Sequence, residues 1–185
     1  MPPSVLLRVL SDIYTRLETL GVSPVIAGGL AVSFWGHPRS TQDIDLAIIS
    51  PNKNRFETDL IRMGLRPTKQ GRWIDLGFVK VSQWIFSVED QYIDCKIDFL
   101  VSDSVFFHQA IEHAINVDFT GIDRGVRFLT VEDLLLFKAA SGRLIDLADI
   151  RTLTQIHRGK LDEDYLKAKA LELKLPSNFW VALDN

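Results

Sequence analysis

Asp43 and Asp45 stand one residue apart at the start of an apolar run, Leu46 to Ile49, and are the residues best suited to metal chemistry. On a β-strand, residues two apart share one face at a separation of about 6.6 Å, so the two carboxylates would project together. Paired carboxylates beside a buried segment repel each other and lose hydration, and a divalent cation between them offsets both effects. Magnesium suits this arrangement because it binds one or two carboxylates together with water and phosphate oxygens.

Gly28 and Gly29 follow the short apolar segment "SPVIA", with thirteen residues between them and the aspartates. Glycines that end a strand and open a helix let a phosphate approach backbone N–H groups, because no Cβ atom stands in the way. Taken alone, a glycine pair is more often a plain tight turn, and an Asp-x-Asp motif is more often a pair of solvent-exposed side chains. The two motifs together, each in strand context, favour a phosphate site beside a metal site.

In combination, "AGG" at 27–29 and "DIDL" at 43–46 resemble the signature of the nucleotidyltransferase superfamily of the DNA polymerase beta type. The spacer "HPRST" is similar to that of the minimal, AbiEii-like toxin branch, and antibiotic nucleotidyltransferases have similar spacers. The resemblance implies transfer of a nucleoside monophosphate from a nucleoside triphosphate to an acceptor hydroxyl, with Mg²⁺ or Mn²⁺ as cofactor. Gly29 stands where many relatives have serine, so no hydroxyl is expected there to hold the triphosphate.

The family pattern also calls for a third carboxylate on a neighbouring strand, and "YIDCKIDFLV" offers two. Asp98 is the favoured candidate because it precedes an apolar run, as Asp45 does. Asp94 is the alternative, although it lies nearer the loop and could pair with Lys96. Asp75 is a weaker candidate, whose other interpretation is an exposed strand residue. The predicted catalytic and metal-binding residues are Asp43, Asp45 and Asp98.

The segment "KAASGRLIDLAD" is similar to a motif of the toxin-like branch, in which a lysine is followed by an arginine and aspartates on the next helix. The matching residues are Lys138, Arg143, Asp146 and Asp149. By the resemblance, Lys138 would neutralise the triphosphate, and Asp146 would orient that lysine or the acceptor. The other interpretation is an exposed Arg143–Asp146 pair and a lysine that reaches solvent from an apolar helix.

Arg39 and Thr41 lie in the "HPRST" loop, which we expect to overhang the nucleotide. An arginine fork can hold a phosphate there, and a solvated loop arginine is the equally weighted alternative. The predicted nucleotide-binding residues are Gly28, Gly29, Arg39, Thr41, Lys138 and Asp146.

Hydrophobic periodicity predicts the α+β class, with a mixed sheet flanked by helices and a C-terminal helical extension. We expect helices over 5–20, 30–36, 52–64, 130–142, 144–157 and 162–174, and strands over 23–27, 42–49, 72–86 and 92–101. Thr130 and Asp162 are expected helix caps, and Pro176 is expected to end the last helix. The predicted domains are a nucleotidyltransferase-like catalytic core over 1–128 and a helical extension packed on it over 129–185.

Charge, the length of apolar runs and the cysteine count exclude several classes of protein. The 185 residues carry a net charge of −3 with a pI near 5.8, which argues against a basic nucleic-acid binder. Apolar runs are interrupted well short of the roughly 20 residues that span a bilayer, so no membrane span is expected. Cys95 is the only cysteine, which rules out an internal disulfide and favours a reducing compartment. We therefore expect a cytoplasmic protein.

The acceptor is the part of the reaction that these motifs do not specify. An RNA 3′ end, a protein hydroxyl and an aminoglycoside or lincosamide antibiotic would all suit the predicted metal site. The C-terminal motif favours the toxin of a toxin–antitoxin pair, acting on tRNA or protein, with an antitoxin protein as partner. The alternatives are an antibiotic nucleotidyltransferase and a catalytically silent nucleotide- or partner-binding module of the same fold.

Overall fold

The computed structural model of the protein describes residues 4–49, 52–68, 73–88, 93–119, 122 and 124–184. Within these residues, eight strands form one sheet in the order β3-β5-β6-β2-β1-β8-β7, and β4 pairs with β5 beside that path. The strands are β1 (Val25–Ile26), β2 (Asp43–Ala47), β3 (Arg66–Pro67), β4 (Ile74–Asp75), β5 (Lys80–Val88), β6 (Ile93–Val101), β7 (Ile115–Asp118) and β8 (Gly125–Phe128). The β2–β6 and β1–β8 pairs are parallel and the other pairs are antiparallel, so the sheet is mixed.

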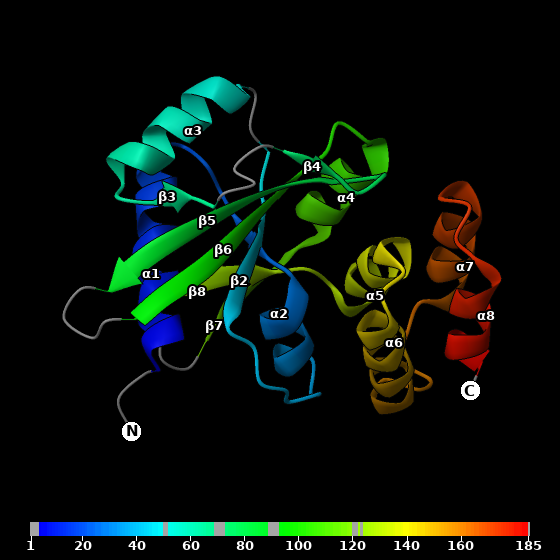
Figure 1. The fold of residues 1–185 in the computed structure, drawn as a ribbon. Coiled ribbons are helices and arrows are strands. Elements are labelled where there is room, and N and C mark those ends of the chain that lie inside the picture. The colour runs from blue at the N-terminus through cyan, green and yellow to red at the C-terminus, as the bar shows by residue number, and fades with distance from the viewer. Residues whose placement is uncertain are drawn as a thin grey trace.

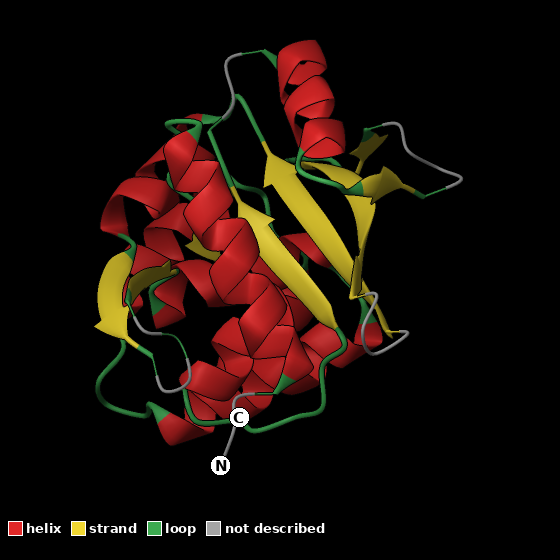
Figure 2. Cartoon of the chain, turned by 90° about the vertical axis from the view of Figure 1, so that its left-hand side faces the viewer, coloured by secondary structure: helices red, strands yellow, loops and turns green. Residues whose placement is uncertain are grey.

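Eight helices accompany the sheet in the described part of the chain (Figures 1 and 2). They are α1 (Val5–Thr19), α2 (Gly28–Phe34), α3 (Lys53–Arg62), α4 (Val105–His113), α5 (Val131–Ser141), α6 (Leu144–Ile156), α7 (Glu163–Glu172) and α8 (Ser177–Asp184). In Figure 1, α1 and α3 lie at the left of the sheet, and α5 to α8 gather at its right. Among the helices described, none has the length and apolar character needed to cross a lipid bilayer.

The predicted α+β fold, a mixed sheet flanked by helices, is confirmed. The expected caps are also present, because Thr130 accepts a hydrogen bond from the Asp133 backbone N–H and Asp162 accepts one from that of Tyr165. The segment predicted as a strand over 72–86 divides into β4 and β5, since a turn at Gly77, with φ +91°, separates them.

Several elements depart from the prediction. The helix capped by Asp162 ends at Glu172, before Pro176 as expected, but it is not the last one, because α8 begins directly after Pro176. The elements without a counterpart among the predicted ones are β3, α4, β7, β8 and α8. Arg72 and Tyr92, the first residues of two predicted strands, lie outside the described residues. The division into a core over 1–128 and an extension over 129–185 stays a prediction.

The parallel pairing of β2 and β6 positions the acidic residues. It sets Asp45 opposite Asp98 and Asp43 opposite Lys96. Because successive strand residues point to opposite faces, the residues between them point the other way and fill the core. These fully buried side chains are Ile44, Leu46, Ile97 and Phe99.

Asp133 is a fully buried carboxylate that connects three helices. Its Oδ1 accepts a hydrogen bond from the Tyr165 hydroxyl of α7 at 2.6 Å. Its Oδ2 accepts one from Thr130 at 2.9 Å and lies 3.2 Å from His113 Nδ1 at the end of α4. Burial, and next the hydrogen bond to Asp133, raises the pKa of Tyr165, so the phenol remains a neutral donor. One carboxylate thus joins α4, α5 and α7.

We predict that Asp133→Ala lowers the free energy of unfolding by about 2–4 kcal/mol, because Tyr165 and Thr130 lose a charged acceptor inside the protein. Urea denaturation followed by circular dichroism measures this change. Asp164→Ala, an exposed position in the first turn of α7, is the control and should change the value by less than about 0.5 kcal/mol. Equal stabilities of the two variants would contradict the assigned role of Asp133.

Candidate active site

Residues of β2 and β6 line a cleft of about 720 Å³. This volume is within the range of small-molecule binding sites. The three predicted carboxylates lie in it, Asp43 and Asp45 from β2 and Asp98 from β6. The predicted nucleotide-binding residues also line it, namely Gly28, Gly29, Arg39, Thr41, Lys138 and Asp146. The fold therefore brings every residue of the predicted site to one cavity. A second cavity, of about 180 Å³, lies at α6 and α7 and contains none of them.

Asp45 is a carboxyl group of the cleft whose pKa is strongly raised by its surroundings. Burial, followed by the charges of Asp98 and Asp43, raises the pKa of Asp45 to about 6. The positive charge of Lys138 and a hydrogen bond from the Gly29 backbone N–H act in the opposite direction. Ionisation of Asp45 is therefore less favourable than that of an ordinary aspartate, and the positive charge of a divalent cation would favour it.

Gly28 is the residue that lets α2 begin against the Asp45 side chain. Its backbone has φ +54°, in the left-handed region that glycine adopts without strain. A Cβ atom at this position would lie 1.8 Å from Asp45 Oδ2, well inside contact distance. The first glycine of the pair is therefore required both by its backbone conformation and by the carboxylate beside it.

Gly29 is required for a different reason. A Cβ atom there would lie 2.7 Å from Thr41 Oγ1 and 3.1 Å from Arg39 Nη2. The loop before β2 thus occupies the space that a serine side chain would need. In this chain the Thr41 hydroxyl and the Arg39 guanidinium stand close to where many relatives present the serine hydroxyl.

Lys138 supplies a buried positive charge on the α5 side of the cleft. Its side chain is 4% exposed, and its Nζ lies 2.8 Å from Asp146 Oδ1 and 2.7 Å from Asp149 Oδ2, both on α6. Burial opposes ionisation of Asp146, but hydrogen bonds from Arg143 and Lys138 hold its pKa below the ordinary value. The i,i+3 pair of Arg143 and Asp146 that the alternative named does form, at 2.6 Å. The rest of the alternative is wrong, because Asp146 and Lys138 are both buried and the lysine does not reach solvent.

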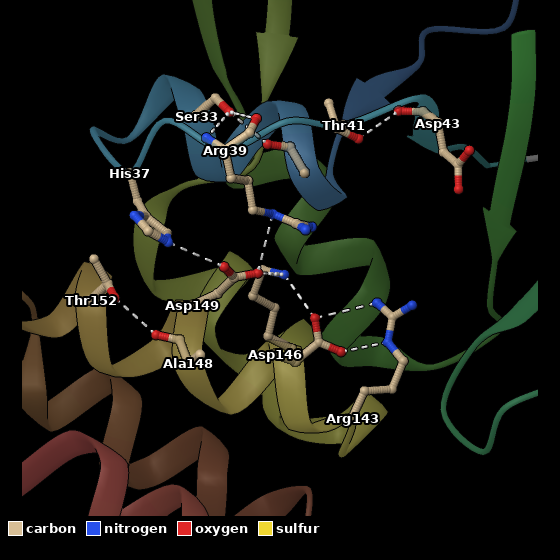
Figure 3. A network of polar contacts seen from close by, with 12 residues as sticks. Ser33, His37, Arg39, Thr41, Asp43, Arg143, Asp146, Ala148, Asp149 and Thr152 are labelled. Atoms are coloured by element: carbon tan, nitrogen blue, oxygen red, sulfur yellow. Dashed lines mark hydrogen bonds and ion pairs between the residues drawn. The ribbon is translucent and has the colours of Figure 1, made fainter.

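Arg39 reaches from the loop before β2 toward Asp149 on α6, with His37 beside it (Figure 3). Its Nε lies 3.6 Å from Asp149 Oδ2, which is too far for a hydrogen bond. This Nε is buried and has no hydrogen-bond partner among the described residues. Arg39 therefore keeps donor capacity that an anionic ligand could use. The alternative of a solvated loop arginine does not fit this buried nitrogen.

Lys96 is a cleft residue that sequence reasoning missed. Its Nζ lies 3.3 Å from Asp43 Oδ2 and 3.1 Å from Asp98 Oδ2. Gln83 of β5, also missed, donates a hydrogen bond to Asp98 Oδ2 at 3.2 Å. The spacing of Lys96 and Asp98 on one face of β6 was a usable signal, but the register against β2 decides the partner.

Asp94 and Asp75, the weaker candidates for the third carboxylate, lie outside the cleft. Asp94 does not form the possible pair with Lys96; it is 3.4 Å from Arg66 Nη2 and accepts a hydrogen bond from Ser87. Asp75 is exposed on β4 and accepts a hydrogen bond from the Gly77 backbone N–H. Neither residue lines the cleft.

The donor set fits a divalent metal held mainly by the Asp43–Asp45 pair. Within the described ranges, no three acidic, histidine or cysteine side chains converge closely enough to hold a metal by themselves. Magnesium does not need three, because it takes one or two carboxylates and completes its shell with water and phosphate oxygens. In addition, Asp98 Oδ1 is buried and has no hydrogen-bond partner among the described residues, a condition that calls for a donor or a cation.

Comparison with known proteins agrees with this geometry. Residues 13–177 match the family described as "Nucleotidyl transferase AbiEii toxin, Type IV TA system". The chain belongs to the AbiEii nucleotidyltransferase family. The resemblance seen in the sequence is therefore confirmed, and membership places the chain among enzymes that transfer nucleotidyl groups. No curated protein matches the chain significantly.

Solved structures share the fold of this AbiEii-family chain at low sequence identity. ANT(2")-Ia in complex with adenylyl-2"-tobramycin is 14% identical with a TM-score of 0.59, over 92% of this chain and 98% of that one. The lincosamide antibiotic adenylyltransferase LnuA, lincomycin-bound, is 16% identical with a TM-score of 0.53, over 84% and 99%. A putative nucleotidyltransferase from Thermotoga maritima is 18% identical with a TM-score of 0.55, over 82% and 94%. These similarities establish a nucleotidyltransferase fold.

We predict that Gly28→Ala abolishes the rise in melting temperature caused by Mn²⁺ with a nucleoside triphosphate, because the new methyl group displaces Asp45. Gly64→Ala is the matched control, since Gly64 also has a positive φ, +87°, but no other atom lies within 4 Å of the position that an alanine methyl group would take there. Both variants should lose about 1–2 kcal/mol of stability from backbone strain. A ligand-induced shift that survives in Gly28→Ala would contradict this interpretation of the glycine.

Proposed function

We propose that the protein is a magnesium-dependent enzyme that moves a nucleoside monophosphate from a nucleoside triphosphate to an acceptor hydroxyl. The observation that carries the proposal is the convergence of nine predicted residues on one cleft. In the reaction, the acceptor oxygen bonds to the α-phosphorus while the bond to the pyrophosphate oxygen breaks. The proton of the acceptor hydroxyl passes to a base of the protein.

Asp43 and Asp45 are the proposed metal ligands. Their common face on β2 and the raised pKa of Asp45 support this role, because both carboxylates gain from a shared positive charge. When bound, Mg²⁺ or Mn²⁺ supplies charge neutralisation for the phosphate oxygens.

The triphosphate is proposed to lie between the glycine pair and α5. Gly28 and Gly29 leave room for phosphate beside the backbone, and Thr41 and Arg39 border the same space. Lys138 of α5 lines the same cleft. Asp146 and Asp149 serve to orient this lysine, as their 2.8 Å and 2.7 Å contacts support.

Asp98 is the proposed base for the acceptor hydroxyl. Burial raises its pKa, although Lys96 and Gln83 act in the opposite direction, and a higher pKa makes a carboxylate a better proton acceptor. Its Oδ1 is the oxygen without a partner in the described structure, so it retains capacity for this proton.

For the biological role, we propose the toxin of a toxin–antitoxin pair, with an antitoxin protein as partner and RNA or protein as acceptor. The family match supports the toxin role. The net charge of −3 disfavours an extended RNA interface, so an RNA acceptor would be engaged at its end. The cytoplasmic location expected from the single cysteine remains a prediction.

An antibiotic nucleotidyltransferase is the second candidate. The likeness to the two antibiotic-modifying structures supports it at the level of fold. A catalytically silent binding module is the third alternative, and it would bind metal and nucleotide without releasing pyrophosphate.

The proposal is tested by incubating the protein with each α-phosphate-labelled nucleoside triphosphate, Mg²⁺ or Mn²⁺, and a bacterial extract, an aminoglycoside or a lincosamide. Label in an RNA, protein or small-molecule fraction identifies the acceptor class and should vanish in the Asp43→Ala/Asp45→Ala variant. No label in any fraction, together with a metal-dependent thermal shift caused by nucleotide, would favour the silent module.

We further predict that Asp98→Asn slows transfer by about 10²–10⁴-fold, because the base is lost while the nucleotide site is kept. Asp94→Asn is the matched control, the same change on the same strand outside the cleft, and should leave the rate unchanged. Single-turnover assays measure both rates. Greater loss of activity in Asp94→Asn than in Asp98→Asn would reverse the assignment.

A further inference from the structure

Lys96 occupies the gap between the first and third carboxylates of the proposed site. Its position follows from the sheet, since β6 pairs with β2 so that Lys96 lies opposite Asp43, two residues before Asp98. The ammonium nitrogen is 3.3 Å from Asp43 Oδ2 and 3.1 Å from Asp98 Oδ2. The lysine side chain remains about one-third exposed, at 35%, so it reaches the gap from the edge of the cleft.

Both contacts have the length of an ion pair between an ammonium group and a carboxylate, so the Lys96 ammonium fills the space between Asp43 and Asp98. A magnesium ion bound to the same two oxygens, at about 2.0–2.1 Å, would have to displace the lysine. Asp98 Oδ2 already receives Lys96 and the amide of Gln83, so this oxygen is committed to two protein donors. The lack of a three-ligand metal cluster among the described residues agrees with this spacing.

We propose that Lys96 acts as a fixed cation in place of a second divalent metal, so that the enzyme binds one metal ion at Asp43 and Asp45. Lys96 is then a positioning residue, which holds Asp98 in place as the base. This assignment rests on the proposed function and differs from the sequence-based expectation that Asp98 binds metal.

The test is the number of Mn²⁺ ions bound per chain in the presence of a non-hydrolysable α,β-methylene nucleoside triphosphate, counted by electron paramagnetic resonance of free Mn²⁺. The wild-type protein should bind one ion, and Lys96→Met should bind two, because the vacated gap between Asp43 and Asp98 accepts the second. Lys96→Arg, which keeps the charge, should bind one. Lys80→Met, on the neighbouring strand and outside the cleft lining, is the control and should also bind one.

Melting temperatures check that each variant is folded, and Lys96→Gln replaces Lys96→Met, with the same expected count, if the methionine variant does not fold. Two ions in the wild type, or one ion with unchanged affinity in the neutral variants, would overturn the role of Lys96 while leaving the proposed function intact. Absence of Mn²⁺ binding in every variant would overturn both.

Discussion

The parallel pairing of β2 with β6 determines where the acidic side chains of the cleft lie. It lays Asp45 beside Asp98, so that like charges meet next to a fully buried core. Burial and the charges of the neighbouring carboxylates raise the pKa of Asp45, so a nearby cation stabilises its ionised form. The residues around it supply space and positive charge. Gly28 provides space beside the Asp45 carboxylate, and the charge of Lys138 lowers its pKa. Lys96 pairs with the neighbouring carboxylates of Asp43 and Asp98.

Residues of the C-terminal helices α5 and α6 line the same cleft as the acidic residues of the sheet. Lys138 of α5 is held by Asp146 and Asp149 of α6, and Asp149 also faces Arg39 from the loop before β2. Segments far apart in the sequence thus meet in one charged network (Figure 3). Buried charges contribute little net stability, because desolvation offsets their attraction. A network of this kind, opening into a cleft, is therefore better explained by the binding of an anionic ligand than by stability.

Much of the site could be predicted from the sequence, because its residues belong to short local patterns. Strand alternation is enough to place Asp43 and Asp45 on one face and to prefer Asp98, next to an apolar run, over Asp94. The partner of Lys96 could not be predicted in the same way, since it depends on the register between two strands that are distant in sequence. The same holds for Gly29, whose missing side chain is explained only by the loop that folds over it. The turn at Gly77 was also missed, because alternation continues on both sides of it.

The proposed function requires the paired aspartates of β2 to hold a metal ion against the triphosphate of a bound nucleotide. The most direct measurement is the anomalous diffraction of Mn²⁺ in crystals grown with an α,β-methylene nucleoside triphosphate. We expect a manganese peak between the carboxylates of Asp43 and Asp45, with the phosphate chain running toward Lys138 and the glycine pair. A nucleotide bound outside this cleft, or manganese peaks away from β2, would contradict the proposed metal and nucleotide site.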